Sequence, residues 1–202
     1  MDFVAAIKSD ALNIKKRTPV EPDFWVLIFG DLTVFSVLFI AFMLRRFESA
    51  ETHTVFSMGT ESLNQSIGLI NTLVLLTSSY AVVLALSYYR SGDLNKMIKF
   101  TCFAIFCGLG FVCLKIFEYI EKINQGITVT ADRFFELYFT FTGIHLLHVL
   151  IGISLLTIVA YRMSLKKPDA FTTPGFVEGV TCYWHMVDLL WLILFALFYL
   201  LG

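Results

Sequence analysis

Long apolar runs alternate with short polar segments along the whole chain. Five of these runs are each at least about 20 residues long, which is the length that a helix needs to cross the hydrocarbon of a bilayer. The runs are Phe24 to Leu44, Ile67 to Tyr89, Ile98 to Ile120, Phe134 to Tyr161 and Val180 to Leu201. The pattern predicts an all-α, polytopic membrane bundle of five transmembrane helices.

The polar segments between the runs are too short for a second domain. The longest one, Arg45 to Ser66, leaves room for one short helix outside the membrane. We therefore expect residues 1–202 to form a single membrane domain. Near the N-terminus, Phe3, Ile7 and Ile14 have the spacing of one face of a short surface helix, and no secretory signal is apparent there.

The composition agrees with a membrane protein. Apolar residues make up 57% of the chain and charged residues only 15%, and the charged residues gather between the apolar runs. An ordinary soluble domain of this length is less apolar. No basic patch indicates nucleic acid, so the expected surroundings are the lipid bilayer and other membrane proteins.

Lysine and arginine are divided unevenly between the two sides of the predicted bundle. One side has Lys8, Lys15, Lys16, Arg17, Arg90, Lys96, Lys99, Arg162, Lys166 and Lys167, whereas the other has Arg45, Arg46, Lys122 and Arg133. Basic residues accumulate in the cytoplasmic loops of membrane proteins. We therefore predict a cytoplasmic N-terminus and a C-terminus outside, because the number of spans is odd.

The last apolar run has a polar interruption from Tyr183 to Trp191, with the sequence Tyr-Trp-His-Met-Val-Asp-Leu-Leu-Trp. His185 and Asp188 lie three residues apart and therefore share a helix face. An ionised side chain at this depth costs about 2.5 to 3.5 kcal/mol on insertion scales, so it needs a partner or a purpose. We expect a buried hydrogen bond between His185 and Asp188.

Other polar residues within the runs are placed to join this pair. Asp31 in the first run lies at a depth comparable to that of His185 and Asp188. Either Asp31 or His148, from neighbouring helices, would close the hydrogen-bonded pair. The predicted polar cluster consists of Asp31, His145, His148, Glu178, His185 and Asp188. Such a cluster would either lock helices together or relay protons.

The third run contains charges of alternating sign. Lys115, Glu118 and Lys122 follow one another at spacings of three and four residues, which favours an ion-paired ladder on one helix face. The stem of Lys115 is long enough to snorkel towards the membrane surface. We therefore expect Lys115 and Glu118 to form an ion pair at the outer membrane interface.

Ligands for a metal or a haem are scarce. The chain has four histidines, and His53 lies in an outer loop, which leaves His145, His148 and His185 in the membrane. The paired Glu-x-x-His motifs of di-iron bundles are absent, and the four cysteines lack the spacing of a zinc or redox site, so we expect them to be buried like small apolar residues. We predict no metal, no cofactor and no catalytic residue in this chain. A b-type haem held by His148 and His185 is an alternative.

These motifs together resemble subunit III of cytochrome c oxidase. Glu178, followed by Tyr183 to Trp191, resembles the family signature in which a Glu precedes Tyr-Trp-His-Phe-Val-Asp-Val-Val-Trp. Thr142 to Gly152 resembles the family's Gly-x-His-Gly-x-His-Val-x-x-Gly helix. Glu118-Tyr119 and the stretch Asn71 to Ser79 are similar to two earlier motifs, so the resemblance covers all five runs in order.

The number of spans resembles the short forms of this family. The mitochondrial type has seven spans and a Glu at the position that Asp31 takes here, whereas bacterial quinol oxidases and a protein associated with nitric oxide reductases have short forms. Leu76 to Ser79, Lys115 to Lys122 and Gly143 to His148 are most similar to the branch associated with nitric oxide reductases.

The resemblance implies a non-catalytic subunit of a haem-copper oxidase-type respiratory complex in a bacterial inner membrane. Its partner would be the large catalytic subunit, which carries haem and copper, and its role would be to support assembly, stability and proton uptake. The resemblance also implies bound phospholipid, although two helices that build one wall of the family's lipid cleft are missing here. A different hypothesis is a small proton-coupled transporter that uses Asp31, His185 and Asp188.

Overall fold

The computed structural model describes residues 20–166 and 169–201. The long helices are α2 (Pro22–Arg46), α4 (Gln65–Ser91), α5 (Leu94–Asn124), α6 (Arg133–Leu165) and α7 (Pro174–Phe195), and the shorter elements are α3 (Ala50–Ser62), the 3-10 turn η2 (Ala170–Thr172) and the π-helical turn η3 (Ala196–Leu200). The predicted surface helix with Phe3, Ile7 and Ile14 lies outside the described residues.

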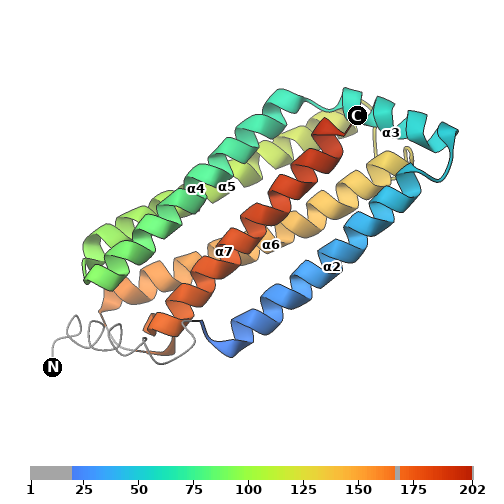
Figure 1. The fold of residues 1–202 in the computed structure, drawn as a ribbon. Coiled ribbons are helices and arrows are strands. Elements are labelled where there is room, and N and C mark those ends of the chain that lie inside the picture. Colours follow the sequence, from blue (N-terminus) through green and yellow to red (C-terminus); the bar gives the residue numbers. More distant parts are fainter. Residues whose placement is uncertain (1–19, 167–168, 202) are drawn as a thin grey trace.

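The five long helices run side by side and form an elongated bundle, and α3 lies across one end of it (Figure 1). Within the described ranges, five helices are long and apolar enough to cross a membrane. This confirms the predicted all-α bundle with five spans. The start of α2 and the end of α7 lie at opposite ends of the bundle, and which end faces the cytoplasm stays a prediction.

Most helix ends lie further out than the apolar runs predicted, and several of these ends have polar caps. The Asn64 side chain accepts hydrogen bonds from the first turn of α4, and Gly92 ends that helix with a positive φ of 81°, a conformation that glycine adopts without strain. Asp93 caps α5, and a hydrogen bond from the Lys96 side chain lowers the pKa of its carboxyl. Thr173 caps α7, which begins at Pro174, six residues before the predicted start at Val180.

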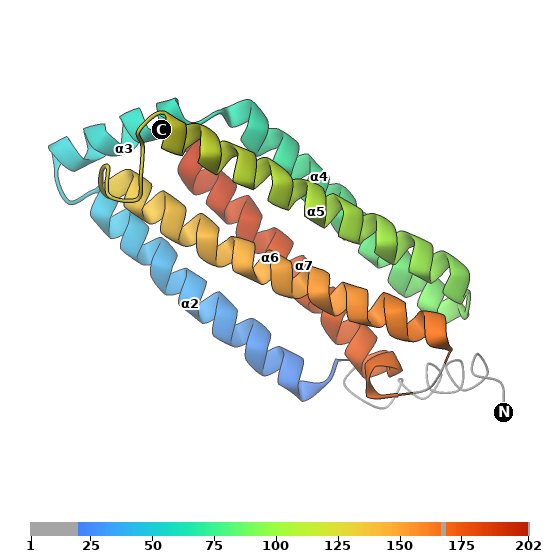
Figure 2. The ribbon, with the colours of Figure 1, turned by 180° about the vertical axis from the view of Figure 1, so that it is seen from behind.

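The last helix, α7, lies at the centre of the bundle. It packs against α2, α4 and α6, and α6 also packs against α5 (Figure 2). In the apolar stretch of α7, 61% of the residues are buried within the chain, compared with 17% in α2. The polar interruption predicted in the last run therefore lies where three other helices meet.

Close contact between α6 and α7 depends on a glycine facing a tryptophan. A Cβ atom at Gly152 would lie 2.7 Å from the ring of Trp184, and one at Gly108 of α5 would lie 3.0 Å from the same ring. Gly110 and Gly143 have no such neighbour within 4 Å. Gly152 and Gly108 therefore let the Trp184 ring approach the backbones of α6 and α5 closely.

The prediction of buried cysteines is wrong for two of the four. Cys102 and Cys113 lie on the exposed side of α5, and Cys107 and Cys182 are half-buried. An apolar run that spans a membrane has no need to bury its outer face, because lipid is as apolar as a protein core. The hydrophobic pattern therefore did not distinguish the inner from the outer face.

Candidate functional site

The structure divides the predicted polar cluster among several places in the bundle. Asp31 and His148 pair across α2 and α6, with 3.4 Å between His148 Nε2 and Asp31 Oδ1. His148 Nδ1 lies 2.8 Å from the carbonyl oxygen of Ile144, an acceptor, so Nδ1 carries a hydrogen. With its hydrogen on Nδ1, a neutral His148 ring has only a lone pair at Nε2, and an ionised Asp31 carboxylate also only accepts. A hydrogen bond between Nε2 and Asp31 therefore needs one further proton, on either the imidazole or the carboxyl group. The hydroxyl of Tyr183 on α7 donates to the His148 carbonyl at 3.5 Å.

His185 bonds to a neighbouring helix and not to Asp188. Its Nδ1 lies 2.6 Å from the Ser79 hydroxyl of α4 and 4.0 Å from Asp188 Oδ2, which is too long for a hydrogen bond. The predicted bond between His185 and Asp188 is therefore wrong, because α4 brings a closer partner to the ring. Neither Asp31 nor His148 closes this pair, since those two residues contact each other.

Asp188 is enclosed without a clear partner. The residue is 4% exposed, and neither carboxylate oxygen has a hydrogen-bond partner within residues 20–166 and 169–201. A buried carboxyl group without a partner is costly. The surroundings of His185 and Asp188 therefore include a buried carboxyl group that has no hydrogen-bond partner in the described part of the chain.

His145 is also alone, although it lies one helical turn from His148. Its ring is fully buried between Phe111 and Trp191, with ring centroids 5.8 and 5.5 Å away, and neither ring nitrogen has a hydrogen-bond partner in the described part of the chain. His148 turns towards α2 instead. The two histidines therefore do not converge on a shared ligand, and the described residues include no group of three or more His, Cys, Asp or Glu that would hold a metal ion.

Glu178 forms an ion pair that the sequence reasoning missed. Arg90 Nη2 and Nε lie 2.7 and 3.2 Å from Glu178 Oε1 and join the end of α4 to the start of α7. Glu178 is 3% exposed, whereas the arginine side chain is 55% exposed. The sequence pattern places Arg90 in a loop and gives no sign of its contact with a buried carboxylate.

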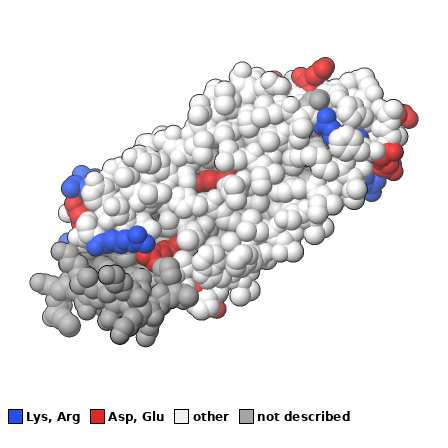
Figure 3. Space-filling model, viewed as in Figure 1, with Lys and Arg blue, Asp and Glu red and all other residues white. Residues whose placement is uncertain are grey.

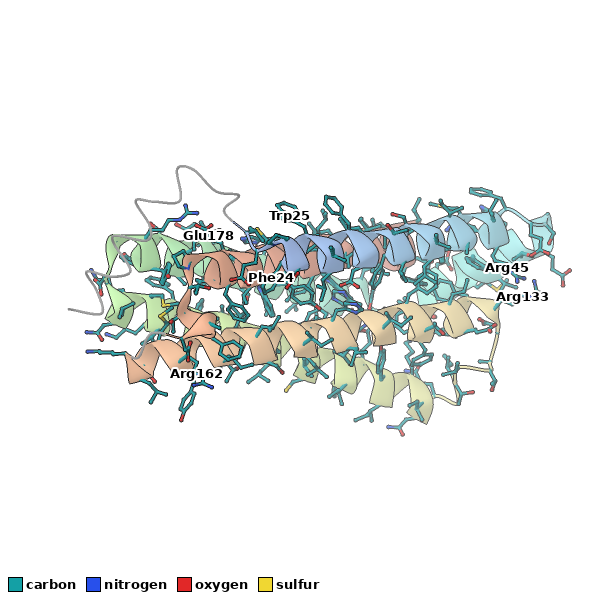
Figure 4. The ribbon with its side chains drawn as sticks, turned by 90° about the horizontal axis from the view of Figure 1, so that it is seen from below. Phe24, Trp25, Arg45, Arg133, Arg162 and Glu178 are labelled. Carbon is teal, nitrogen blue, oxygen red and sulfur yellow. The ribbon has the colours of Figure 1, made fainter. Side chains whose placement is uncertain are left out.

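The ends of the bundle hold most of the other charges. Figure 3 shows acidic and basic side chains at the two ends and a mostly uncharged surface between them, with a small acidic spot midway. At the α3 end, Glu48 Oε2 lies 3.7 Å from Arg45 and 3.3 Å from Arg133, two arginines that lie close together in Figure 4. At the other end, Arg162 lies 3.2 Å from Asp169. This distribution is typical of a membrane-spanning bundle.

The most complete polar network surrounds Lys115. Its ammonium group donates to Glu118 at 2.9 Å, to the Tyr138 hydroxyl at 2.9 Å and to the Tyr199 hydroxyl at 3.1 Å. The Tyr199 hydroxyl in turn donates to the other Glu118 oxygen at 2.6 Å. An ammonium group has three donors, and all three are used here. We call these four residues the Lys115 network.

Residues far apart in sequence form the Lys115 network. Tyr199 comes from the turn η3 at the end of α7, where Gly68 of α4 makes room for it, because a Cβ atom at Gly68 would lie 2.8 Å from the Tyr199 ring. The ring of Trp191 also lies 5.2 Å from the lysine ammonium, and its N–H donates to the Thr72 hydroxyl at 3.0 Å. The network therefore joins α5, α6, the end of α7 and, through packing, α4.

Lys115 and Glu118 form the expected ion pair, but the pair is buried inside the bundle. Lys115 and Glu118 are each 1% exposed, so the lysine does not snorkel to the surface. Lys122 does not continue the ladder, since its ammonium group donates to the Ser62 carbonyl at the end of α3. The sequence reasoning missed Tyr138 and Tyr199, although a tyrosine inside an apolar run is itself a signal, because a buried hydroxyl usually finds a partner.

The Lys115 network and the two ion pairs described above are suited to holding helices together. Removing one partner of a buried ion pair costs about 3–5 kcal/mol, because the other charge is left without compensation. In the Lys115 network all three ammonium donors, the Tyr199 hydroxyl and both carboxylate oxygens are used, so this part of the bundle is rigidly specified. Asp31 with His148 and Arg90 with Glu178 add two further links between helices.

Comparisons with known proteins agree on one family. A family model described as "Cytochrome c oxidase subunit III" matches residues 13–202. Cytochrome c oxidase subunit 3 of Bacillus subtilis (strain 168) is 29% identical over 181 residues, which cover 89% of this chain and 84% of the relative. The corresponding subunit of Bacillus sp. (strain PS3) is 27% identical over 180 residues, with 89% and 84% coverage. Quinol oxidase subunit 3 of Bacillus subtilis (strain 168) is 27% identical over 179 residues, with 89% and 85% coverage.

The names of these relatives bear on two of the hypotheses. They belong to cytochrome c and quinol oxidases, so the resemblance to the branch associated with nitric oxide reductases stays a prediction. They give no support to the hypothesis of a proton-coupled transporter.

Proposed function

Because this chain belongs to the cytochrome c oxidase subunit III family, we propose that it is the non-catalytic integral subunit III of a haem-copper oxidase-type complex in a bacterial inner membrane. The observation that carries the proposal is the family match over residues 13–202. Haem and copper would reside in the large catalytic subunit that this chain contacts. Its place is therefore in respiratory electron transport, without a redox centre of its own.

The contacts inside the bundle support a role in assembly and stability. The Lys115 network, the Arg90–Glu178 pair and the Asp31–His148 pair each tie together helices that are distant in sequence. Such a bundle presents a defined surface to a neighbour without rearrangement. We infer that the predicted polar residues act chiefly as links between helices, and that a contribution of Asp31 and His148 to proton uptake by the catalytic subunit is secondary.

The proposal also covers the orientation of the chain, the terminal electron acceptor and bound phospholipid. The distribution of basic residues supports a cytoplasmic N-terminus and an outer C-terminus. The terminal acceptor is oxygen if the partner is an oxidase and nitric oxide if it is a reductase, so the identity of the partner decides the branch. Bound phospholipid is expected from the family, and lipid analysis of the purified complex tests it.

Affinity purification through a tag on this chain tests the proposed function. From native membranes, we expect a large polytopic subunit with a haem spectrum to co-purify, whereas the chain purified alone shows no haem absorption. One haem per isolated chain would contradict a subunit without redox centres. Proton flux in liposomes that contain this chain alone would instead support the transporter.

A further inference from the structure

We propose that the outward face of α7 at His185 is a docking surface for a transmembrane helix of another subunit, and that His185 forms a hydrogen bond with that helix at mid-membrane depth. The inference rests on the proposed function, because it names the face that meets the partner. The docking surface is defined by His185, Leu189 and Leu192, which follow one another at helical spacings of four and three residues and lie on one face.

This face is the open side of the most enclosed helix in the bundle. On its other sides α7 contacts α2, α4 and α6, and in Figure 1 it lies in front of α6 and between α2 and α4. Along the open side, the side chain of His185 is 36% exposed, Leu189 is 50% exposed and Leu192 is 37% exposed. A helix laid along this side would therefore contact α7 directly.

The imidazole of His185 has one nitrogen left for an outside partner. Its Nδ1 is used by the Ser79 hydroxyl at 2.6 Å, and no hydrogen bond of Nε2 is found within the described ranges. Asp188 lies 4.0 Å from the ring with both oxygens unpartnered inside the described part of the chain. The site thus combines a His185 ring nitrogen that has no hydrogen bond with the nearby, buried Asp188 carboxyl group that also has none in the described part of the chain.

The chemistry of the site selects a protein helix over lipid. Acyl chains offer no hydrogen-bonding group, and a polar group left unsatisfied in hydrocarbon is costly. A hydroxyl or amide side chain both donates and accepts, so it satisfies either tautomer of His185. By contrast, the outer face of α5 presents Phe103, Phe106 and Leu109, which lipid satisfies fully. The occupant is therefore a transmembrane helix with a hydroxyl or amide side chain at mid-depth.

Two substitutions separate docking from an internal structural role. In His185→Gln the side-chain amide group lies near the position of Nε2 and keeps the bond to the partner helix. In His185→Asn the amide group lies near the position of Nδ1 and keeps only the bond to Ser79. We expect complexes purified through a tag on this chain to retain the partner with His185→Gln. With His185→Asn we expect retention to fall by about three- to twentyfold, the range of single hydrogen bonds between membrane helices. The reverse order, or full retention by both variants, would overturn the proposal.

Photo-crosslinking in the intact complex gives an independent test. A photoreactive residue at Leu189 should capture another subunit, whereas the same residue at Phe106, which is 72% exposed on α5, should capture lipid. Capture of lipid alone, or of a second copy of this chain, from Leu189 would refute the docking surface. If no other subunit co-purifies with the unsubstituted chain, the proposed function fails, and that result is distinct from failure of this surface.

Discussion

At the scale of single residues, Lys115 explains how a charge is accommodated inside an apolar bundle. Its ammonium group makes three hydrogen bonds, and the aromatic rings of Tyr138 and Trp191 lie 4.9 and 5.2 Å from it. Each of these contacts offsets part of the cost of removing the charge from water. Asp188 and His145 are the opposite case, since the described residues supply no hydrogen bond to either side chain.

Lys115→Met should destabilise the bundle strongly. The substitution leaves Glu118 buried with only Tyr199 as a donor, and we expect a loss of about 3–5 kcal/mol in the free energy of unfolding, measured in mixed detergent micelles. Lys96→Met, which removes an exposed lysine paired with Asp93, is the control and should change stability little. The double variant Lys115→Met/Glu118→Leu should recover much of the loss. Equal stability of Lys115→Met and the unsubstituted chain would contradict the Lys115 network.

Tyr199→Phe tests the link to the end of the chain. It removes the hydroxyl that contacts Lys115 and Glu118, and hydrogen bonds to charged groups contribute about 1.5–3 kcal/mol. Tyr80→Phe is the control, because Tyr80 is 65% exposed. The free energy of unfolding of Tyr199→Phe should be lower than that of Tyr80→Phe by this amount. If both variants unfold alike, the Tyr199 hydroxyl has no role in stability.

At the scale of the helices, packing depends on which face each helix turns to its neighbours. Gly152→Ala places a Cβ atom 2.7 Å from the Trp184 ring and should cost about 1–3 kcal/mol through overpacking of α6 against α7. Gly143→Ala, on the same helix with no atom within 4 Å, should be neutral or slightly stabilising, because alanine favours helices over glycine. Denaturation of the two variants in parallel checks the difference, and equal effects would contradict the packing.

The sequence predicts features within one helix better than contacts between helices. Apolar runs predicted the five spans, and the spacing of Lys115 and Glu118 predicted their pairing, because both signals lie within one helix. Contacts between helices, such as His185 with Ser79, depend on how each helix is rotated. A run that is apolar on every side does not encode that rotation, so the predicted bond between His185 and Asp188 was wrong. The tyrosines of the Lys115 network were overlooked although their hydroxyl groups required partners.

At the scale of the whole molecule, the bundle is a framework of helices linked by buried polar contacts. We propose that this chain supports a haem-copper complex without holding haem. The test is the haem content per catalytic subunit, measured by absorption spectroscopy in complexes purified with and without this chain. We predict the same haem content in both preparations, with lower yield or stability when the chain is missing. Loss of one haem for each missing chain would instead show that this chain holds a haem.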